Sequence, residues 1–569
     1  MKRIISIAAT LISVFGVGFL IVEYGFYLPP HTMSKLDSIV YMLAGVLAAQ
    51  FLARVILASD RRAFIAHNKA ETILMCLFAL ALLAVRVLPT SPALLYLSPR
   101  SGLSLSCQAF FVGFLVLRIR YLKTLFVSMR VSAPVVVVTS FLIIIAVGML
   151  LLALPVATVP GRATSAIDAL FTATSATCVT GLIVQDTGSH FSLFGQGVIL
   201  VLIQIGGLGI MTLASFFSLL AGNLGVQDRV ILRDVVRYDN LGKIGALLLG
   251  VLGLTLIFEA VGAVLLYLQF LPMEATPMQA AYSAIFHSIS GFCNAGFSLY
   301  VTSFTGYRAS VPINLIMTSL IIAGGLGFVV LISLFHLFSS HTSRLKRRLS
   351  LNCKLVLIVT VILLAAGTLL FYLGERHNTL EHLPLGQSLL ASYFQSVTAR
   401  TAGFNTVSIG ALTSFSALCL MLLMFIGASP GSTGGGIKTS TFATILVTIR
   451  SMTLGKDQVE VLKRTIPRTT VYAALSVVTL ALGWLSISSL ILCFTEGAPF
   501  LQTVFEVFSA YGTVGLSQGL TASLTSWGKL VIITTMFVGR LGPLTLALAI
   551  SGRQIAKRYA YPHESVIIG

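Results

Sequence analysis

The chain has 569 residues, of which 56% are hydrophobic and only 10% are charged, and its mean hydropathy is +0.97. A water-soluble globular protein cannot build its surface from so few charged residues, so the composition predicts a polytopic membrane protein. Spanning helices need about 20 mostly apolar residues, and about twelve such segments are present. They lie near residues 4–27, 37–58, 72–90, 103–118, 132–155, 191–221, 244–270, 311–339, 354–373, 415–449, 470–494 and 527–551.

The formal net charge of +19 could indicate a nucleic-acid partner, but the basic residues gather in alternate loops. With the N-terminus inside, 27 of the 37 lysines and arginines fall on the inner side. They are Lys2, Arg3, Arg54, Arg61, Arg62, Lys69, Arg118, Arg120, Lys123, Arg130, Arg229, Arg233, Arg237, Lys243, Arg344, Lys346, Arg347, Arg348, Lys354, Arg450, Lys456, Lys463, Arg464, Arg468, Arg553, Lys557 and Arg558. The positive-inside rule explains this bias, so we expect two cytoplasmic termini and no nucleic-acid partner.

The first 130 residues are expected to form a separate block of about four helices. The run that follows Met1-Lys2-Arg3 has no small-residue cleavage site and is interpreted as a retained helix. Four helices before a pore could indicate a voltage sensor. However, Arg118, Arg120, Lys123 and Arg130 cluster at the end of a helix instead of repeating every third residue through it.

Four short loops with a central glycine recur along the rest of the chain. We call them the glycine loops: loop 1 (178–182), loop 2 (294–297), loop 3 (401–404) and loop 4 (513–516). Their glycines, Gly181, Gly296, Gly403 and Gly515, are 115, 107 and 112 residues apart. An aromatic residue stands ten positions before each glycine, and a second glycine cluster follows 24 to 28 positions after it. A repeat at fixed spacing indicates one structural unit used four times.

Each unit is predicted to contain an outward helix, a short half-helix, a glycine loop and a returning helix. The half-helices, expected at 165–176, 277–290, 385–398 and 499–510, are too short and too polar to span a membrane. Non-helical backbone survives at membrane depth only when it is buried in protein or faces a water-filled cavity. The predicted fold is therefore an all-α membrane protein with four covalently linked helix–pore-loop–helix repeats around one pseudo-fourfold pore. The expected boundaries are 1–130 for the N-terminal block, 131–222, 243–340, 353–450 and 468–553 for the repeats, and 554–569 for a cytoplasmic tail.

The glycine loops are candidates for a cation selectivity filter. A dehydrated cation needs oxygen ligands, and rings of backbone carbonyls supply them to potassium. Glycine permits the backbone angles that aim successive carbonyls at one axis. The candidate ion-binding residues are Cys178, Val179, Thr180, Gly181, Asn294, Ala295, Gly296, Thr401, Ala402, Gly403, Thr513, Val514 and Gly515. The expected ion is K⁺, as transported cargo, with no cofactor.

These loops resemble those of the Trk/Ktr/HKT superfamily of potassium transporters, over about residues 131–553. The likeness is strongest to bacterial membrane subunits of the TrkH and KtrB type. In that superfamily a glycine in all four loops accompanies potassium preference, whereas a serine in the first loop accompanies sodium transport in some plant members. Because Gly181 occupies the first position here, the resemblance implies potassium. It also implies a homodimer in the bacterial inner membrane and a cytoplasmic RCK-type nucleotide-binding regulatory subunit of the TrkA or KtrA kind. The basic inner segments 344–354 and 450–468 are candidate docking surfaces for that subunit.

A gate is expected in the third returning helix. The segment 427–439 contains five glycines and a proline, which cannot continue a stable helix. Its candidate gating residues are Gly427, Gly431, Gly434, Gly435, Gly436 and Lys438, with Arg540 of the fourth returning helix opposite them. An intramembrane charge costs about 2.5–3.5 kcal/mol or more, so Arg540 should face water or carbonyls, and 434–436 offers the expected partners. In the resembled superfamily the equivalent loop is the gate, and the equivalent arginine is a barrier beneath the filter.

The remaining glycine clusters, 206–209 and 324–327, are expected to be sites of close helix packing. Arg400, beside loop 3, could either brace the loop through carbonyl contacts or deter cation entry, and bracing is favoured. His287 is expected to be a hydrogen-bonded core residue.

The sequence therefore predicts channel-like potassium uptake through a carbonyl-lined filter. The alternative is a proton- or sodium-coupled potassium transporter with alternating access, which would typically show inverted repeats and intramembrane carboxylates. An enzyme is not expected, because the sequence shows no HExxH motif and no paired carboxylates.

Overall fold

The computed structural model describes residues 2–26, 29–58, 60–87, 103–104, 106–114, 117, 133–221, 244–339 and 349–551. Several predicted features lie outside these residues. They are the tail 554–569, the basic residues from Arg118 to Arg130, from Arg229 to Lys243 and from Arg344 to Arg348, and Arg553, Lys557 and Arg558.

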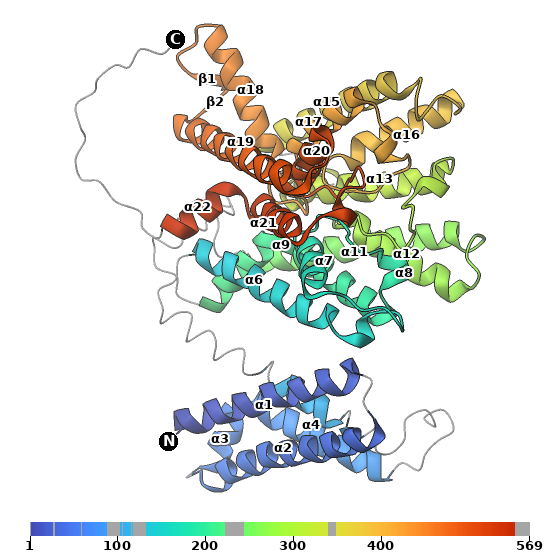
Figure 1. Ribbon diagram of the computed structural model, residues 1–569. Helices are drawn as coiled ribbons and strands as arrows, with labels where there is room; N and C mark the ends of the chain where they lie inside the picture. The colour runs from blue at the N-terminus through green and yellow to red at the C-terminus, as the bar shows by residue number, and fades with distance from the viewer. Residues whose placement is uncertain are drawn as a thin grey trace.

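The N-terminal block has its own hydrophobic core. Its helices are α1 (Lys2–Gly25), α2 (Pro30–Ile56), the short α3 (Arg61–His67) and α4 (Lys69–Val87), and residues 106–114 are also helical. Phe110, Phe111 and Phe114 pack among Val40 and Phe78 in the centre of this bundle. Figure 1 shows α1 to α4 side by side at one end of the molecule, and α1 contacts the 3-10 turn η2 (Pro155–Ala157) of the following unit.

Four units of similar construction follow. Each has a long helix, a short helix, a glycine loop and a helix that returns in two pieces. The helices are α6 (Ala133–Leu152), α7 (Ala166–Thr177), α8 (Thr187–His190) and α9 (Leu193–Ala221) in unit 1; α11 (Ile244–Phe270), α12 (Pro277–Phe292), α13 (Val311–Leu326) and α14 (Phe328–Ser339) in unit 2; α15 (Leu351–Glu375), α16 (Leu385–Thr398), α17 (Ser414–Phe425) and α18 (Thr439–Thr453) in unit 3; and α19 (Arg468–Glu496), α20 (Phe500–Gly512), α21 (Ser526–Leu541) and α22 (Pro543–Ser551) in unit 4. The short helices α7, α12, α16 and α20 begin and end within two residues of the predicted half-helices.

All four returning helices are broken, which corrects the expectation that only the third one is. Gly209 (φ 64°) interrupts α9, Gly327 (φ 88°) separates α13 from α14, and Gly542 (φ 84°) separates α21 from α22. The bend at Gly327 is 102°. These φ angles favour glycine over any residue with a side chain, so the last glycine of each cluster ends the helix. The first glycines, Gly206 and Gly324, do provide the close packing that was predicted.

The breaks also contribute to a number of uninterrupted spans lower than the expected twelve. Within the described residues five helices are long and apolar enough to cross a membrane, or six if α13 and part of α14 count as one bent span. The five lie in α2, α6, α11, α15 and α19, so each unit contributes its first long helix. Hydropathy alone joined the two pieces of each returning helix, because it does not register the backbone angle at a glycine.

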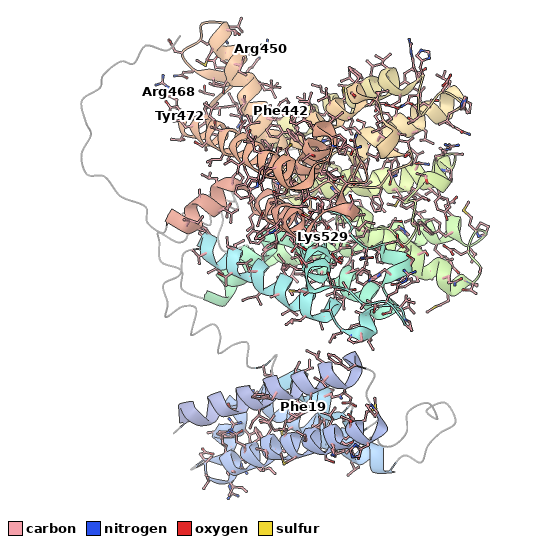
Figure 2. All side chains as sticks on the ribbon, in the orientation of Figure 1. Phe19, Phe442, Arg450, Arg468, Tyr472 and Lys529 are labelled. Carbon is pink, nitrogen blue, oxygen red and sulfur yellow. The ribbon has the colours of Figure 1, made fainter. Side chains whose placement is uncertain are left out.

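Each returning helix packs on the short helix of the next unit. The contacts are α9 with α12, α13 with α16, α17 with α20 and, to close the circle, α21 with α7. An ion pair strengthens the last contact, since Lys529 Nζ of α21 lies 2.6 Å from Asp168 Oδ1 of α7. Lys529 is labelled in Figure 2, where it lies at the junction of these two helices. The four units therefore follow one another around a closed circle in chain order.

Units 3 and 4 share a further detail at one end. Glu375 ends α15 and accepts hydrogen bonds from the backbone N–H and the hydroxyl of Thr413, the residue before α17. Glu496 ends α19 and accepts the same two bonds from Thr525, the residue before α21. At the opposite end of α19, β1 (Val459–Val461) and β2 (Arg464–Ile466) form an antiparallel hairpin after α18.

Candidate functional site

The four glycine loops share one backbone conformation. In each loop the glycine has a positive φ, between 72° at Gly296 and 92° at Gly515. The residue two positions before it also has a positive φ, although it is not glycine. These residues are Val179, Asn294, Thr401 and Thr513. Left-handed residues with side chains are uncommon and persist only where their surroundings enforce them, so their recurrence at one position of four loops marks a shared constraint.

The glycines of the four loops lie against one another. A Cβ atom added at Gly181 would come within 2.5 Å of the Ala295 carbonyl oxygen, and one at Gly296 within 2.8 Å of the Ala402 carbonyl oxygen. In the same way Gly403 faces the Val514 carbonyl oxygen, and Gly515 faces the Thr180 carbonyl oxygen. Each glycine thus touches the next loop, and the fourth touches the first. All thirteen predicted ion-binding residues lie in these four loops, and no side chain fits between the glycines.

Serines that the sequence reasoning missed fix three of the loops. Ser175 accepts a hydrogen bond from the Gly181 N–H (3.1 Å) and donates one to the Leu182 carbonyl (2.7 Å). Ser290 donates to the Phe297 carbonyl (2.8 Å), and the hydroxyl of Ser509 accepts from the Gly515 N–H (3.1 Å). Each serine stands six residues before its glycine, so the repeat spacing contained the signal that could have identified them.

Loop 3 departs from this pattern. Val397 occupies the position of the serine, and the N–H groups of Ala402 and Gly403 both donate to the Thr398 carbonyl. Loop 3 is instead joined to loop 2, since the side chains of Asn294 and Thr401 are hydrogen-bonded at 3.2 Å. The loops are therefore alike in backbone but not in the side chains that hold them.

The 427–439 segment lies directly against the loops. Its Gly435 N–H donates to the Thr513 hydroxyl (3.0 Å), and a Cβ at Gly434 would overlap the hydroxyl of Thr401. Its backbone hydrogen bonds to other units are with the broken ends of the returning helices of units 2 and 4. They are Ser429 N to Gly325 O (3.0 Å), Thr433 N to Gly324 O (3.3 Å), Phe328 N to Gly431 O (2.9 Å) and Gly436 N to Gly539 O (3.3 Å). The segment is thus bonded to units 2 and 4 and packed on loop 3.

Arg540 links this segment to unit 1. Its guanidinium donates to the carbonyl oxygens of Thr433 and Gly206, and the residue is 5% exposed. The sequence predicted carbonyl partners at 434–436, but the observed partner in this segment is Thr433, one residue earlier. The Gly206 partner was not predicted, because 334 residues separate it from Arg540. Lys438 also turns inward and donates from Nζ to the Gly434 carbonyl (2.7 Å). Arg540 and Lys438 therefore bring two positive charges close to the glycine loops, and both are bonded to backbone carbonyls.

Two other predicted side chains had different outcomes. His287 is fully buried and is hydrogen-bonded to the Ser283 carbonyl (2.7 Å) and the Ser298 hydroxyl (3.1 Å), which confirms its interpretation as a core residue. The favoured bracing role for Arg400 was wrong. Within the described part of the chain its side chain makes no hydrogen bond to any carbonyl, and its Nε has no partner.

Comparisons with known proteins identify the family of this chain. The TrkH family, described as cation transport proteins, matches residues 108–555. The chain belongs to this family. Ktr system potassium uptake protein B of Bacillus subtilis (strain 168) is 40% identical over 443 residues, which cover 77% of this chain and 97% of that protein. Potassium/sodium uptake protein NtpJ of Enterococcus hirae is 37% identical over 451 residues, which cover 78% of this chain and 98% of that protein.

A solved structure shares the fold. The crystal structure of the potassium transporter TrkH from Vibrio parahaemolyticus superposes with a TM-score of 0.59 at 20% sequence identity, over 85% of this chain and 97% of that one. Membership of this family, together with the apolar helices, shows a multi-pass transmembrane protein. Most of the N-terminal block, residues 1–107, lies before the family match.

Proposed function

We propose that this chain takes up potassium through a selectivity filter formed by the carbonyls of the four glycine loops. One observation carries the proposal: the glycines touch in a closed circle, and each is preceded at the second position by a left-handed residue. In each glycine loop, left-handed residues occupy every second position, which turns successive carbonyls to the same side of the loop. Four such loops in a circle then direct their carbonyls at one axis. Carbonyl rings of this kind replace the hydration shell of a potassium ion.

The chemistry of the loops favours a cation. Their side chains are small, apolar or uncharged, so no carboxylate competes with the carbonyls for the ion. The short helices α7, α12, α16 and α20 end at the loops, and the C-terminal end of a helix carries a partial negative charge that attracts cations. The names of two relatives specify potassium uptake and potassium/sodium uptake, which supports potassium as the main ion but leaves room for sodium.

The 427–439 segment is proposed to be the gate. Gly427, Gly431, Gly434, Gly435 and Gly436 give it the backbone freedom to move, and its bonds to units 2 and 4 hold it against the glycine loops. Arg540 and Lys438 place two positive charges there, which oppose the passage of a cation. Opening then requires that two hydrogen bonds break, the one from Arg540 to the Thr433 carbonyl and the one from the Gly435 N–H to the Thr513 hydroxyl.

The assembly is proposed to match that of the relatives. We infer repeats at 131–222, 243–340, 353–450 and 468–553, both termini in the cytoplasm, and a homodimer in the bacterial cell membrane. The name "Ktr system" indicates that the relative works with other components, and we infer a cytoplasmic nucleotide-binding partner here. Arg450 and Arg468, labelled in Figure 2, lie near the β1–β2 hairpin and are candidates for its docking surface.

Ion flux into liposomes tests the proposal. The purified full-length protein should carry ⁸⁶Rb⁺ down its gradient, unlabelled K⁺ should compete better than Na⁺, and chloride should not pass. Equal permeation of chloride would disprove a carbonyl filter.

The alternative, coupled transport by alternating access, has one observation in its favour. Glu259 is a buried carboxylate within the α11 span, bonded to the Gln204 amide (3.2 Å) and close to the Cys293 thiol beside loop 2. Single-channel recording separates the two mechanisms, because unitary rates far above 1,000 ions per second, roughly the upper end of ordinary turnover, exclude one conformational cycle per ion.

A further inference from the structure

A small cavity of about 20 Å³ lies behind loop 3, where units 2 and 3 meet. It is lined by residues of α13 and α15, by the end of α16 with Arg400, which precedes loop 3, and by the start of the 427–439 segment. The lining residues that matter here are Gly325, Leu326, Thr360, Leu364, Arg400 and Ala428. Most of the wall is apolar, and two polar side chains face into it.

Both of these polar side chains lack a partner in the part of the chain that the structure describes. Arg400 is only 7% exposed, its Nε has no acceptor, and no described carboxylate pairs with it. The hydroxyl of Thr360, which is 5% exposed, is also unpaired. A buried charge is normally compensated by an opposite charge or by a full set of hydrogen bonds. The Nε of Arg540 also has no acceptor, but unlike Arg400 the guanidinium of Arg540 has two carbonyl partners.

We propose that this cavity binds one small monovalent anion of the chloride class, held by the Arg400 guanidinium and the Thr360 hydroxyl. A cavity needs about 10–15 Å³ to hold a single water molecule, so about 20 Å³ has room for one occupant slightly larger than water. An anion compensates the charge of Arg400 as well as its hydrogen-bonding groups, whereas a water molecule compensates only the latter.

The position of the cavity gives the anion a role. Gly325 and Ala428 form part of its wall, and Ser429, the residue after Ala428, donates to the Gly325 carbonyl (3.0 Å). The anion therefore binds where the 427–439 segment is attached to unit 2. It also neutralises a positive charge beside loop 3, which lowers the repulsion felt by a cation in the glycine loops. This second role rests on the proposed function, but the binding itself does not.

Anion binding can be measured without transport. The purified full-length protein is unfolded by heat in potassium chloride and in potassium gluconate at equal ionic strength. A ligand that binds only the folded state raises the unfolding midpoint with its concentration until the site is saturated. We expect a saturable rise with chloride, a smaller rise for Thr360→Val and none for Arg400→Gln. Arg308→Gln, at an exposed arginine away from the cavity, should behave as the unchanged protein.

Crystals grown in bromide provide a readout that does not depend on any variant. Anomalous density between Arg400 and Thr360 supports the proposal even if Arg400→Gln fails to fold. Equal midpoints in chloride and gluconate together with no bromide density would overturn it, and would mean that water occupies the cavity. Loss of ⁸⁶Rb⁺ flux with an intact chloride-dependent midpoint refutes only the proposed function. A chloride-independent midpoint without bromide density, together with normal flux, refutes only the anion site.

Discussion

Alanine at Gly181 should disrupt the contact between loops 1 and 2. A residue with a side chain at φ 86° costs about 1–2 kcal/mol in backbone conformation. The new Cβ would lie 2.5 Å from the Ala295 carbonyl oxygen and 2.9 Å from the Gly296 Cα. Ordinary contacts between carbon and oxygen are about 3.3–3.6 Å, so the carbonyl must move by roughly 1 Å. A displacement of that size removes one proposed ligand of the ion, and we expect at least a tenfold loss of ⁸⁶Rb⁺ flux, equivalent to about 1.4 kcal/mol.

Gly161→Ala is the matched control. Gly161 has nearly the same φ, 85°, but no atom lies within 4 Å of its Cβ position. The two variants therefore share the backbone cost, and only Gly181→Ala adds the collision. Flux in liposomes, normalised to folded protein, should be unchanged for Gly161→Ala and strongly reduced for Gly181→Ala. Equal flux in the two variants would refute the close contact of loops 1 and 2.

Three further predictions concern the groups around the loops. Arg540→Gln should raise basal ⁸⁶Rb⁺ flux, because a positive charge is lost. It should also lower the unfolding free energy by about 1–3 kcal/mol, because a carbonyl is left unpaired. Unchanged flux would contradict a barrier role for Arg540. Ser175→Ala removes both bonds to loop 1, including that to Gly181, so the ratio of Rb⁺ to Na⁺ flux should fall, and a constant ratio would exclude a role in selectivity. A double-mutant cycle of Lys529→Met and Asp168→Asn should give a coupling of about 1–3 kcal/mol, between the values for exposed and buried pairs, while additive effects would show that the pair contributes nothing.

The sequence predicted the repeating parts of this protein better than the contacts between them. The short helices were placed within two residues, because a polar segment followed by a glycine is a local signal. The breaks at Gly209, Gly327 and Gly542 were missed, because apolar residues continue on both sides of each glycine and hydropathy does not depend on φ. Partners in space were harder still. Gly206, bonded to Arg540, lies in another unit, and no local pattern connects the two.

The surroundings of Arg400 could not be predicted from the sequence either. A basic residue immediately before loop 3 suggested a carbonyl partner, which is one way to compensate a buried arginine. The structure turns its side chain into a cavity between two units, and a cavity is a property of packing that no single segment encodes. Residue type therefore predicted that the charge needs compensation but not where the compensation comes from.

The circular order of the units has a consequence for biosynthesis. The last contact of the circle, between α21 and α7, joins Lys529 to Asp168 across 361 residues of chain. Pairings at such separation form late and slowly, and incomplete intermediates expose surfaces that are buried in the finished protein. Until unit 4 has been synthesised, loop 4 is absent and the circle of loops stays open. The polar backbone of loop 1 then has no contact with Gly515. We expect α20 and α21 to complete all four loops at once, so a chain truncated before α20 should be degraded instead of accumulating as a three-unit protein.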